Sequence, residues 1–313
     1  MPLDQDYRVS YPGDCECNVS GRLVVLGLGV VAISCAAVLV RIADAPPLAV
    51  AAFRLLIASM VLLPFGVTRA RREIVWLLRN EWKLLLLAGV LLALHFALWI
   101  ASLSYTTVAS SVVLVTATPL FVALASRLLF KEFLRRETFL GIAISTFGAV
   151  LIGHAGWQVG GAAPSGNFLA LMAAVAMAGY LLIGRRIRRT GGLLAYSTTV
   201  FSVAAVVLVV AVIITGASFI GYTRATYGAM VALALVPQIM GHVSLNWALR
   251  FLPATMVTVA VLGEPVGASF LAWLTLGEAP TGLEILGAIL MLLGIALAFL
   301  RGGLAPARSR AAA

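Results

Sequence analysis

Ten apolar runs limit what this chain can fold into more than any other feature of its sequence. About 20 predominantly apolar residues cross the ~30 Å hydrocarbon core of a bilayer as an α-helix. Helices suit this environment because each segment satisfies its own backbone hydrogen bonds. The expected spans are 23–40, 48–67, 84–103, 108–130, 138–152, 167–184, 196–215, 226–249, 255–276 and 283–300. We therefore predict an all-α integral membrane protein with ten transmembrane helices.

The composition supports this class and excludes others. Of the 313 residues, 62% are hydrophobic and 11% are charged, which exceeds the apolar share of an ordinary soluble domain. The net charge of +10 comes from short basic clusters between apolar runs, so we predict no nucleic-acid partner. The N-terminal 20 residues are acidic and precede a full-length span, unlike a signal peptide. The three cysteines complete no metal-ligand set, so we expect no metal and no cofactor.

The distribution of basic residues predicts the orientation. If the N-terminus is cytoplasmic, 18 Lys and Arg residues fall in cytoplasmic segments and two, Arg41 and Arg224, fall outside. Cytoplasmic loops of membrane proteins carry such an excess. We expect a bacterial-type cytoplasmic (inner) membrane protein with both termini in the cytoplasm. The segment from Arg69 to Lys83 mixes charges with tryptophans, which fits an interfacial helix or a basic loop equally well.

The two halves of the chain repeat each other. A shift of about 146 residues aligns Pro119 with Pro265 and Glu132 with Glu278. The same shift aligns two glycine pairs, Gly141 and Gly148 with Gly287 and Gly294. Each half holds five spans, an odd number, so the second copy must lie inverted in the membrane. Inverted repeats are typical of transporters whose site lies near the midplane between the copies.

The repeat sets the expected domains. They are an N-terminal cytoplasmic tail (1–21), a first repeat (22–153), a linker (154–166), a second repeat (167–301) and a C-terminal cytoplasmic tail (302–313). Because one chain holds all ten spans, we expect the cavity to form within a monomer.

The repeated motifs also carry a resemblance. The first copy reads Leu103-Ser-Tyr-Thr-Thr-Val-Ala … Pro119 … Lys131-Glu132. The second reads Leu249-Arg-Phe-Leu-Pro-Ala-Thr … Gly263-Glu264-Pro265 … Gly277-Glu278. Over about residues 22–301 this pattern resembles tandem EamA domains of the drug/metabolite transporter superfamily. The resemblance implies ten helices in two inverted halves and export of amino acids or other small metabolites. Thr118 stands where the second half has Glu264, so the acid is not paired.

Glu264 is the strongest single candidate for function. It lies ten residues into an apolar run, where a carboxylate costs about 2.5–3.5 kcal/mol on insertion scales. Pro265 beside it removes a backbone donor and weakens the helix. We expect Glu264 to bind a proton or a substrate amine, with a structural carboxyl that is paired to Arg54 or simply held protonated as the alternative. Pro119, Pro237 and Pro265 are the expected helix hinges.

Other polar residues within spans are expected to line the cavity. Gln238, His242 and Asn246 follow at i, i+4 and i+8 and share one helical face. His95 and Trp99 share a face in the same way, and Tyr180 is a further aromatic candidate. Hydrogen bonding between helices is the alternative for the residues of the first two faces, and packing is the favoured alternative for Tyr180. Arg54 within the second span is expected to have a gating, substrate-binding or structural role.

Catalysis is not expected. The chain has no Walker A loop, no G-x-S-x-G and no H-E-x-x-H, so we predict no enzyme activity and no ATP drive. We predict a secondary-active or facilitative transporter that exports small metabolites such as amino acids by alternating access. Its expected partners are the small-molecule substrate, the lipid bilayer and, as a candidate coupling ion, the proton. A flippase for lipids or lipid-linked intermediates is one alternative, and a membrane-embedded enzyme or scaffold is another.

Overall fold

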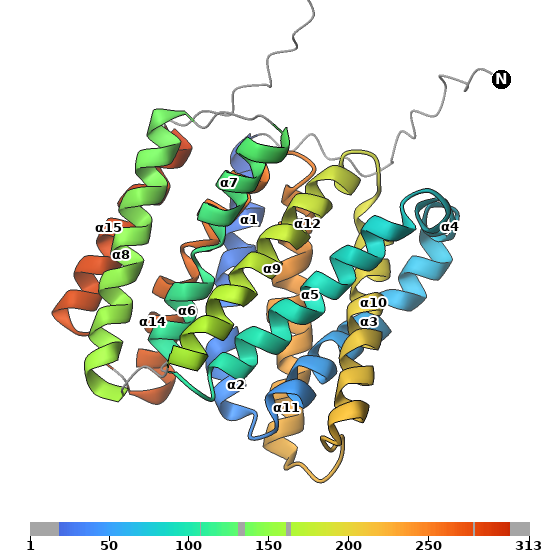
Figure 1. The fold of residues 1–313 in the computed structure, drawn as a ribbon, viewed down its shortest axis with the longest axis horizontal. Coiled ribbons are helices and arrows are strands. Elements are labelled where there is room, and N and C mark those ends of the chain that lie inside the picture. Colours follow the sequence, from blue (N-terminus) through green and yellow to red (C-terminus); the bar gives the residue numbers. More distant parts are fainter. Residues whose placement is uncertain (1–18, 107, 131–134, 161–163, 278, 301–313) are drawn as a thin grey trace, which may run out of the picture.

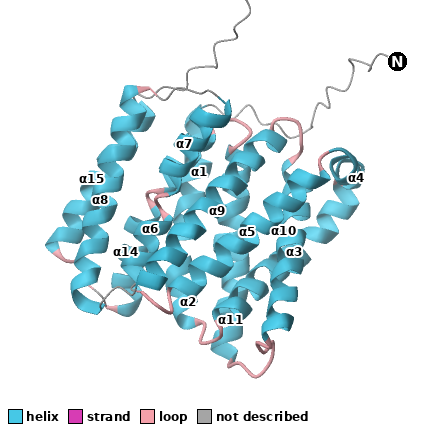
Figure 2. Ribbon diagram, in the orientation of Figure 1, coloured by secondary structure: helices cyan, strands magenta, loops and turns pink. Residues whose placement is uncertain are grey.

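The computed structural model describes residues 19–106, 108–130, 135–160, 164–277 and 279–300, and within these ranges the chain is helical with connecting loops (Figure 2). The first repeat holds α1 (Val19–Ser34), α2 (Ala36–Ile42), α3 (Pro47–Arg69), α4 (Arg71–Asn80), α5 (Trp82–Ser102), α6 (Val108–Val115), α7 (Thr118–Phe130) and α8 (Arg136–Gly160). The second holds α9 (Pro164–Arg188), α10 (Leu193–Thr215), α11 (Arg224–Leu233), the π-helix η1 (Ala234–His242), α12 (Val243–Ala248), α13 (Ala254–Val261), α14 (Glu264–Leu276) and α15 (Gly282–Leu300).

The predicted all-α membrane fold is confirmed. Within the described residues, nine helical segments are long and apolar enough to cross a membrane. They cover nine of the ten predicted runs, several of them as two consecutive helices. The predicted fifth span corresponds to α8, a 25-residue helix that is not among the nine. The number ten therefore stays a prediction.

The helices pack as expected for two copies related by a two-fold axis. The contact of α5 with α9 corresponds to the contact of η1 with α1. Each joins the third span of one repeat to the first span of the other. Three others join a span to its own counterpart: α3 with α10, α8 with α15, and α7 with α13, which belong to the fourth and ninth spans. Figure 1 shows the pair α8 and α15 at one edge of the molecule and α3 and α10 toward the other.

The contact between α8 and α15 shows that this pair is antiparallel. A Cβ added to Gly141 would lie 2.6 Å from the carbonyl oxygen of Gly294, and one added to Gly148 would meet the carbonyl of Gly287. Early residues of one helix thus touch late residues of the other. Between the two contacts, Ser145 Oγ donates to the carbonyl of Met291, 146 positions away, at 3.0 Å. The two-fold relation suggested by the sequence repeat therefore passes beside Ser145.

Several local predictions can be compared with the helix ends. The segment after α3 forms the helix α4, which buries Leu77 and exposes Trp76, as in an interfacial helix. The capping box before α15 is present, because the Thr281 N–H donates to Glu284 Oε2 at 2.6 Å. In the predicted linker 154–166, α8 continues to Gly160 and α9 begins at Pro164. Residues 1–18 and 301–313 and the Glu132–Glu278 correspondence lie outside the described residues.

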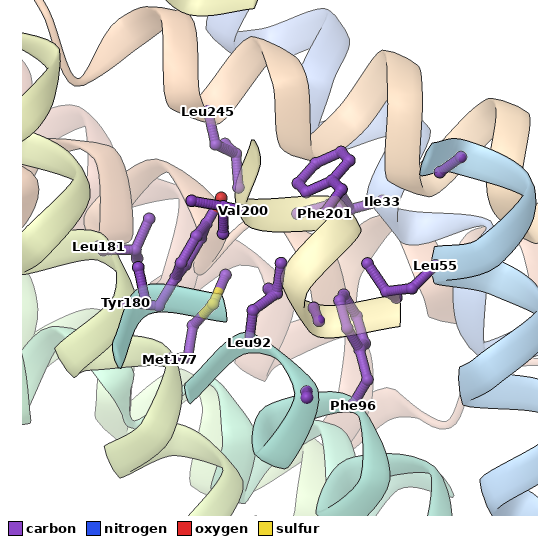
Figure 3. Packing of buried hydrophobic residues seen from close by; sticks show 14 of the residues in the cluster. Ile33, Leu55, Leu92, Phe96, Met177, Tyr180, Leu181, Val200, Phe201 and Leu245 are labelled. Carbon is purple, nitrogen blue, oxygen red and sulfur yellow. The ribbon is translucent and has the colours of Figure 1, made fainter. Parts of the chain in front are cut away.

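The core joins the two halves. Leu55 on α3 and Phe96 on α5 belong to the same buried cluster as Tyr180 on α9 and Phe201 on α10 (Figure 3). Each of these four side chains is at most 1% exposed. Burial of this kind excludes lipid and water from the junction of the repeats, which is where a midplane site has to form.

Four departures from regular helix occur within the spans. The first span breaks at Cys35, between α1 and α2. The fourth breaks before Thr118, and the ninth breaks before Glu264, its counterpart in the second repeat. The eighth contains the π-helix η1. Non-helical backbone at membrane depth is tolerated where it lines a cavity or is buried in protein.

Candidate functional site

All four irregular segments meet at one cavity between the repeats. Ile33 and Ala36 flank the break in the first span, and Thr118 and Glu264 begin the second halves of the fourth and ninth spans. His242 ends η1. Each of these residues lines the cavity. The polar and aromatic lining comprises Arg54, His95, Phe96, Trp99, Thr118, His242 and Glu264.

The cavity is narrow in this conformation. Its volume, counted over positions open to the centre of a water molecule, is about 30 Å³. One water needs about 10–15 Å³ on this measure, so the space holds roughly two. A metabolite can enter only if the surrounding helices separate.

Arg54 is held by the second repeat. Its side chain is 1% exposed, and its Nε donates to Gln238 Oε1 at 2.8 Å. Its guanidinium carbon lies 4.0 Å from the centroid of the Phe96 ring, in a cation–π contact. The sequence suggested Arg54 as a partner of Glu264. The structure instead joins it to Gln238 and Phe96, deep in the protein.

Gln238, expected to line the cavity, is not among its lining residues and reaches the site through its hydrogen bond to Arg54. Four buried polar atoms of the lining and of Gln238 lack a hydrogen-bond partner among the described residues. They are Arg54 Nη1, Trp99 Nε1, Gln238 Nε2 and His242 Nδ1. The first three can only donate, and the His242 nitrogen donates in one tautomer. An unsatisfied buried polar group costs about 1–3 kcal/mol, so a set of this size in one place indicates acceptors supplied by water or ligand.

Glu264 lines this cavity and forms no ion pair with a basic residue among the described residues. It is half-buried and is the first residue of the 13-residue helix α14, whose N-terminal dipole favours negative charge. Arg54 and Glu264 attract each other electrostatically, yet no ion pair joins them among the described residues. The cavity thus carries one positive and one negative group that are not in contact.

Phe96 is a lining residue that the sequence reasoning missed. Its ring meets His95 edge-on at 4.8 Å and His242 at 5.1 Å between centroids, while its face lies under Arg54. His95 also lies parallel to Trp99 at 6.4 Å, and its Nδ1 is 3.0 Å from the carbonyl of Ala173. The position of Phe96 beside His95 was the one available signal, but phenylalanine is ordinary in an apolar span.

Tyr180 and Asn246 form a separate buried cluster and do not line this cavity. Tyr180 Oη donates to Asn246 Oδ1 at 2.5 Å, and Asn246 Nδ2 donates to Ser197 Oγ at 3.3 Å. Arg188 Nε donates to the Asn246 carbonyl at 3.0 Å. The predicted stripe is divided because π-helical turns between Ala234 and His242 change the angular spacing of side chains.

The three predicted hinge prolines all lie at irregular backbone. Pro119 and Pro265 are the second residues of α7 and α14, directly after the two breaks. Proline is accepted at this position because the N–H it lacks would have no partner in a helix start. Pro237 lies inside η1, next to Gln238. A hinge motion at these prolines stays a prediction.

Comparison with known proteins identifies a family and a fold. The model of the EamA-like transporter family matches residues 21–153 and 164–300, one match for each repeat. Two Bacillus subtilis (strain 168) proteins, "Uncharacterized transporter YdfC" and "Uncharacterized transporter YwfM", are 28% and 27% identical. Each alignment covers 80% of this chain, and 81% and 84% of the relatives. A crystal structure with 21% identity shares the fold, with a TM-score of 0.75 over 90% of this chain and 98% of the other.

Proposed function

The chain belongs to the EamA-like transporter family, and we propose that it exports small metabolites such as amino acids by alternating access. The observation that carries this proposal is the cavity where four irregular segments from both repeats meet. Helix interruptions supply free backbone groups and half-helix ends, from which transporters build midplane sites. The site lies within one chain, so a monomer suffices for function.

The symmetry of the packing supports alternating access. Because the repeats are inverted, exchanging their two conformations converts a cavity open to one side into a cavity open to the other. The narrow cavity of this structure then corresponds to a conformation without room for a metabolite. Opening requires the core between α3, α5, α9 and α10 to separate at one end.

The proposed setting is the cytoplasmic (inner) membrane of a bacterium, with both termini in the cytoplasm. The excess of basic residues in the predicted cytoplasmic segments supports this orientation. In this setting Glu264 takes up a proton or a substrate amine, and either event changes the charge of the cavity.

Uptake into proteoliposomes tests the function. Purified protein is reconstituted, and a pooled set of labelled amino acids is supplied with and without an imposed pH gradient. Uptake driven by the gradient establishes a proton-coupled transporter, and uptake down a concentration gradient alone establishes a facilitator. No uptake of any amino acid overturns the proposed substrate class and directs the search to drugs, nucleosides and lipids.

A further inference from the structure

The arrangement of charge in the cavity restricts the ligand beyond its size. Arg54 is fixed by Gln238 and Phe96, and its Nη1 has no partner among the described residues. Glu264, a half-buried residue, is the first residue of α14. Both groups line the same space without forming an ion pair in the part of the chain that the structure describes.

Further unpaired donors lie in the same cavity as the arginine or directly beside it. Gln238, which holds Arg54, keeps Nε2 unpaired, and Trp99 and His242 each bring one unpaired ring nitrogen to the cavity. A carboxylate has about four acceptor positions and matches such a set. A guanidinium and a carboxylate make charge-assisted hydrogen bonds, roughly twice as strong as neutral ones.

We propose that the site selects ligands that are zwitterions, with a carboxylate bound at Arg54 and Trp99 and an ammonium group bound at Glu264. With both protein charges ionised the empty site is neutral, so a neutral dipolar ligand leaves no buried charge uncompensated. A simple amine places a second cation near Arg54, and a simple acid places a second anion near Glu264. An unpaired buried charge is costly in either case. This inference rests on the proposed function and specifies the ligand of that site.

The remaining lining favours an apolar substituent on the zwitterion. Ile33, Val115, Met177, Leu245 and Val261 complete the wall of the cavity. An apolar group of the ligand that packs against this wall favours binding, because apolar area is removed from water. The wall offers no partner to a third charge. The inference therefore applies first to α-amino acids with hydrocarbon side chains.

The test uses three probes that share one hydrocarbon chain. Leucine, 3-methylbutylamine and 4-methylpentanoate are the zwitterion, the amine and the acid of one series. Binding is measured on purified protein at neutral pH, by competition and by thermal shift, with the corresponding valine and phenylalanine series alongside. We expect the zwitterion of at least one series to bind at least tenfold more tightly than its amine and its acid. Equal or tighter binding of an amine or acid overturns the zwitterion assignment, while transport itself stands.

Two substitutions test separately where the carboxylate and the ammonium group of the ligand bind. Arg54→Met should reduce zwitterion binding at least tenfold and shift preference toward the amine, because Glu264 then meets no competing cation. Glu264→Gln should shift preference toward the acid. Arg224→Met and Glu284→Gln make the same chemical changes outside the cavity and should leave the preference unchanged.

The outcomes separate this inference from the proposed function. A structural role for Arg54 or Glu264 would weaken all three probes equally, and that result overturns the inference. Opposite shifts in preference support it. If no probe of any series binds, and pooled uptake is also absent, the proposed substrate class falls together with the inference.

Discussion

Arg54 Nε donates to Gln238 Oε1 over 2.8 Å, joining two residues 184 positions apart in the chain. The bond connects α3 of the first repeat with the π-helix η1 of the second. It aims a buried guanidinium at the cavity and leaves one nitrogen on each partner available. Any conformational change that separates the repeats at this point must break this hydrogen bond or move Arg54 and Gln238 together.

The Gln238 side chain should be necessary to keep Arg54 buried and hydrogen-bonded at the cavity. Gln238→Leu leaves Nε of a buried arginine unpaired, which costs about 1–3 kcal/mol or more. We expect a lower melting temperature in detergent and weaker ligand binding. Gln238→Glu should have the opposite effect on stability, since it pairs with Arg54, and should still abolish binding because it neutralises the arginine. A Gln238→Glu protein that transports normally would contradict this account of the site.

Glu264→Gln should abolish transport or remove its dependence on pH, while the protein still inserts and folds. The amide keeps the size of the side chain but cannot gain or lose a proton in the working range. The measurement is proteoliposome uptake at a series of pH values. Glu284→Gln is the control, since glutamine also completes a capping box. Full, pH-sensitive transport by Glu264→Gln would remove this residue from the mechanism.

Phe96→Leu should weaken ligand binding without unfolding the protein. The face of the ring contacts the Arg54 guanidinium, and cation–π contacts contribute from about 0.5 kcal/mol when exposed to about 2 kcal/mol when desolvated. We expect a loss of affinity of several-fold to about 30-fold. Phe147→Leu makes the same change on α8, where the ring is 58% exposed at the molecular surface, and should leave binding unchanged. Equal effects of the two substitutions would show that Phe96 acts through general packing.

Gly141→Ala should destabilise the contact between α8 and α15. The added Cβ would lie 2.6 Å from the Gly294 carbonyl oxygen, so the helices must move apart. Overpacking of this kind costs about 1–3 kcal/mol. Gly27→Ala is the matched control, because nothing lies within 4 Å of an added Cβ there. Melting temperatures in detergent compare the two, and an unchanged value for Gly141→Ala would argue against close packing at this crossing.

The orientation can be tested with single cysteines in a chain whose three native cysteines are replaced by serine. Ile220→Cys places a thiol in the loop between α10 and α11, and Thr190→Cys places one between α9 and α10. Both positions are exposed. An impermeant maleimide should label the first in intact cells and the second only after permeabilisation. The reverse pattern would invert the proposed topology.

Much of the site could be identified residue by residue before its geometry was known. Glu264, Arg54, His95, Trp99 and His242 stand out because polar side chains are expensive within apolar spans. All five line the cavity. Tyr180 and Asn246 stood out for the same reason and belong instead to a hydrogen-bonded cluster with Ser197. The cost of a polar group in lipid reveals that it has a partner, but it does not distinguish a protein partner from a ligand.

Phe96 and the π-helix show a different limit. Phenylalanine in a membrane span carries no penalty, so nothing marks the one ring that lies beneath a buried arginine. Pro237 indicated a disturbed helix, but the choice of a π-helix over a kink depends on how neighbouring helices satisfy the backbone.

The helical membrane fold and the repeat within it can be predicted from the apolar runs and their spacing alone. Both follow from a constraint that acts on each segment separately, since a backbone in lipid must satisfy its own hydrogen bonds. The tertiary structure alone decided which polar groups meet. It pairs Arg54 with Gln238, keeps Glu264 apart from both, and removes Asn246 from the stripe. These choices depend on contacts between residues distant in sequence and on a local change of helical pitch, and neither can be read from spacing along the chain.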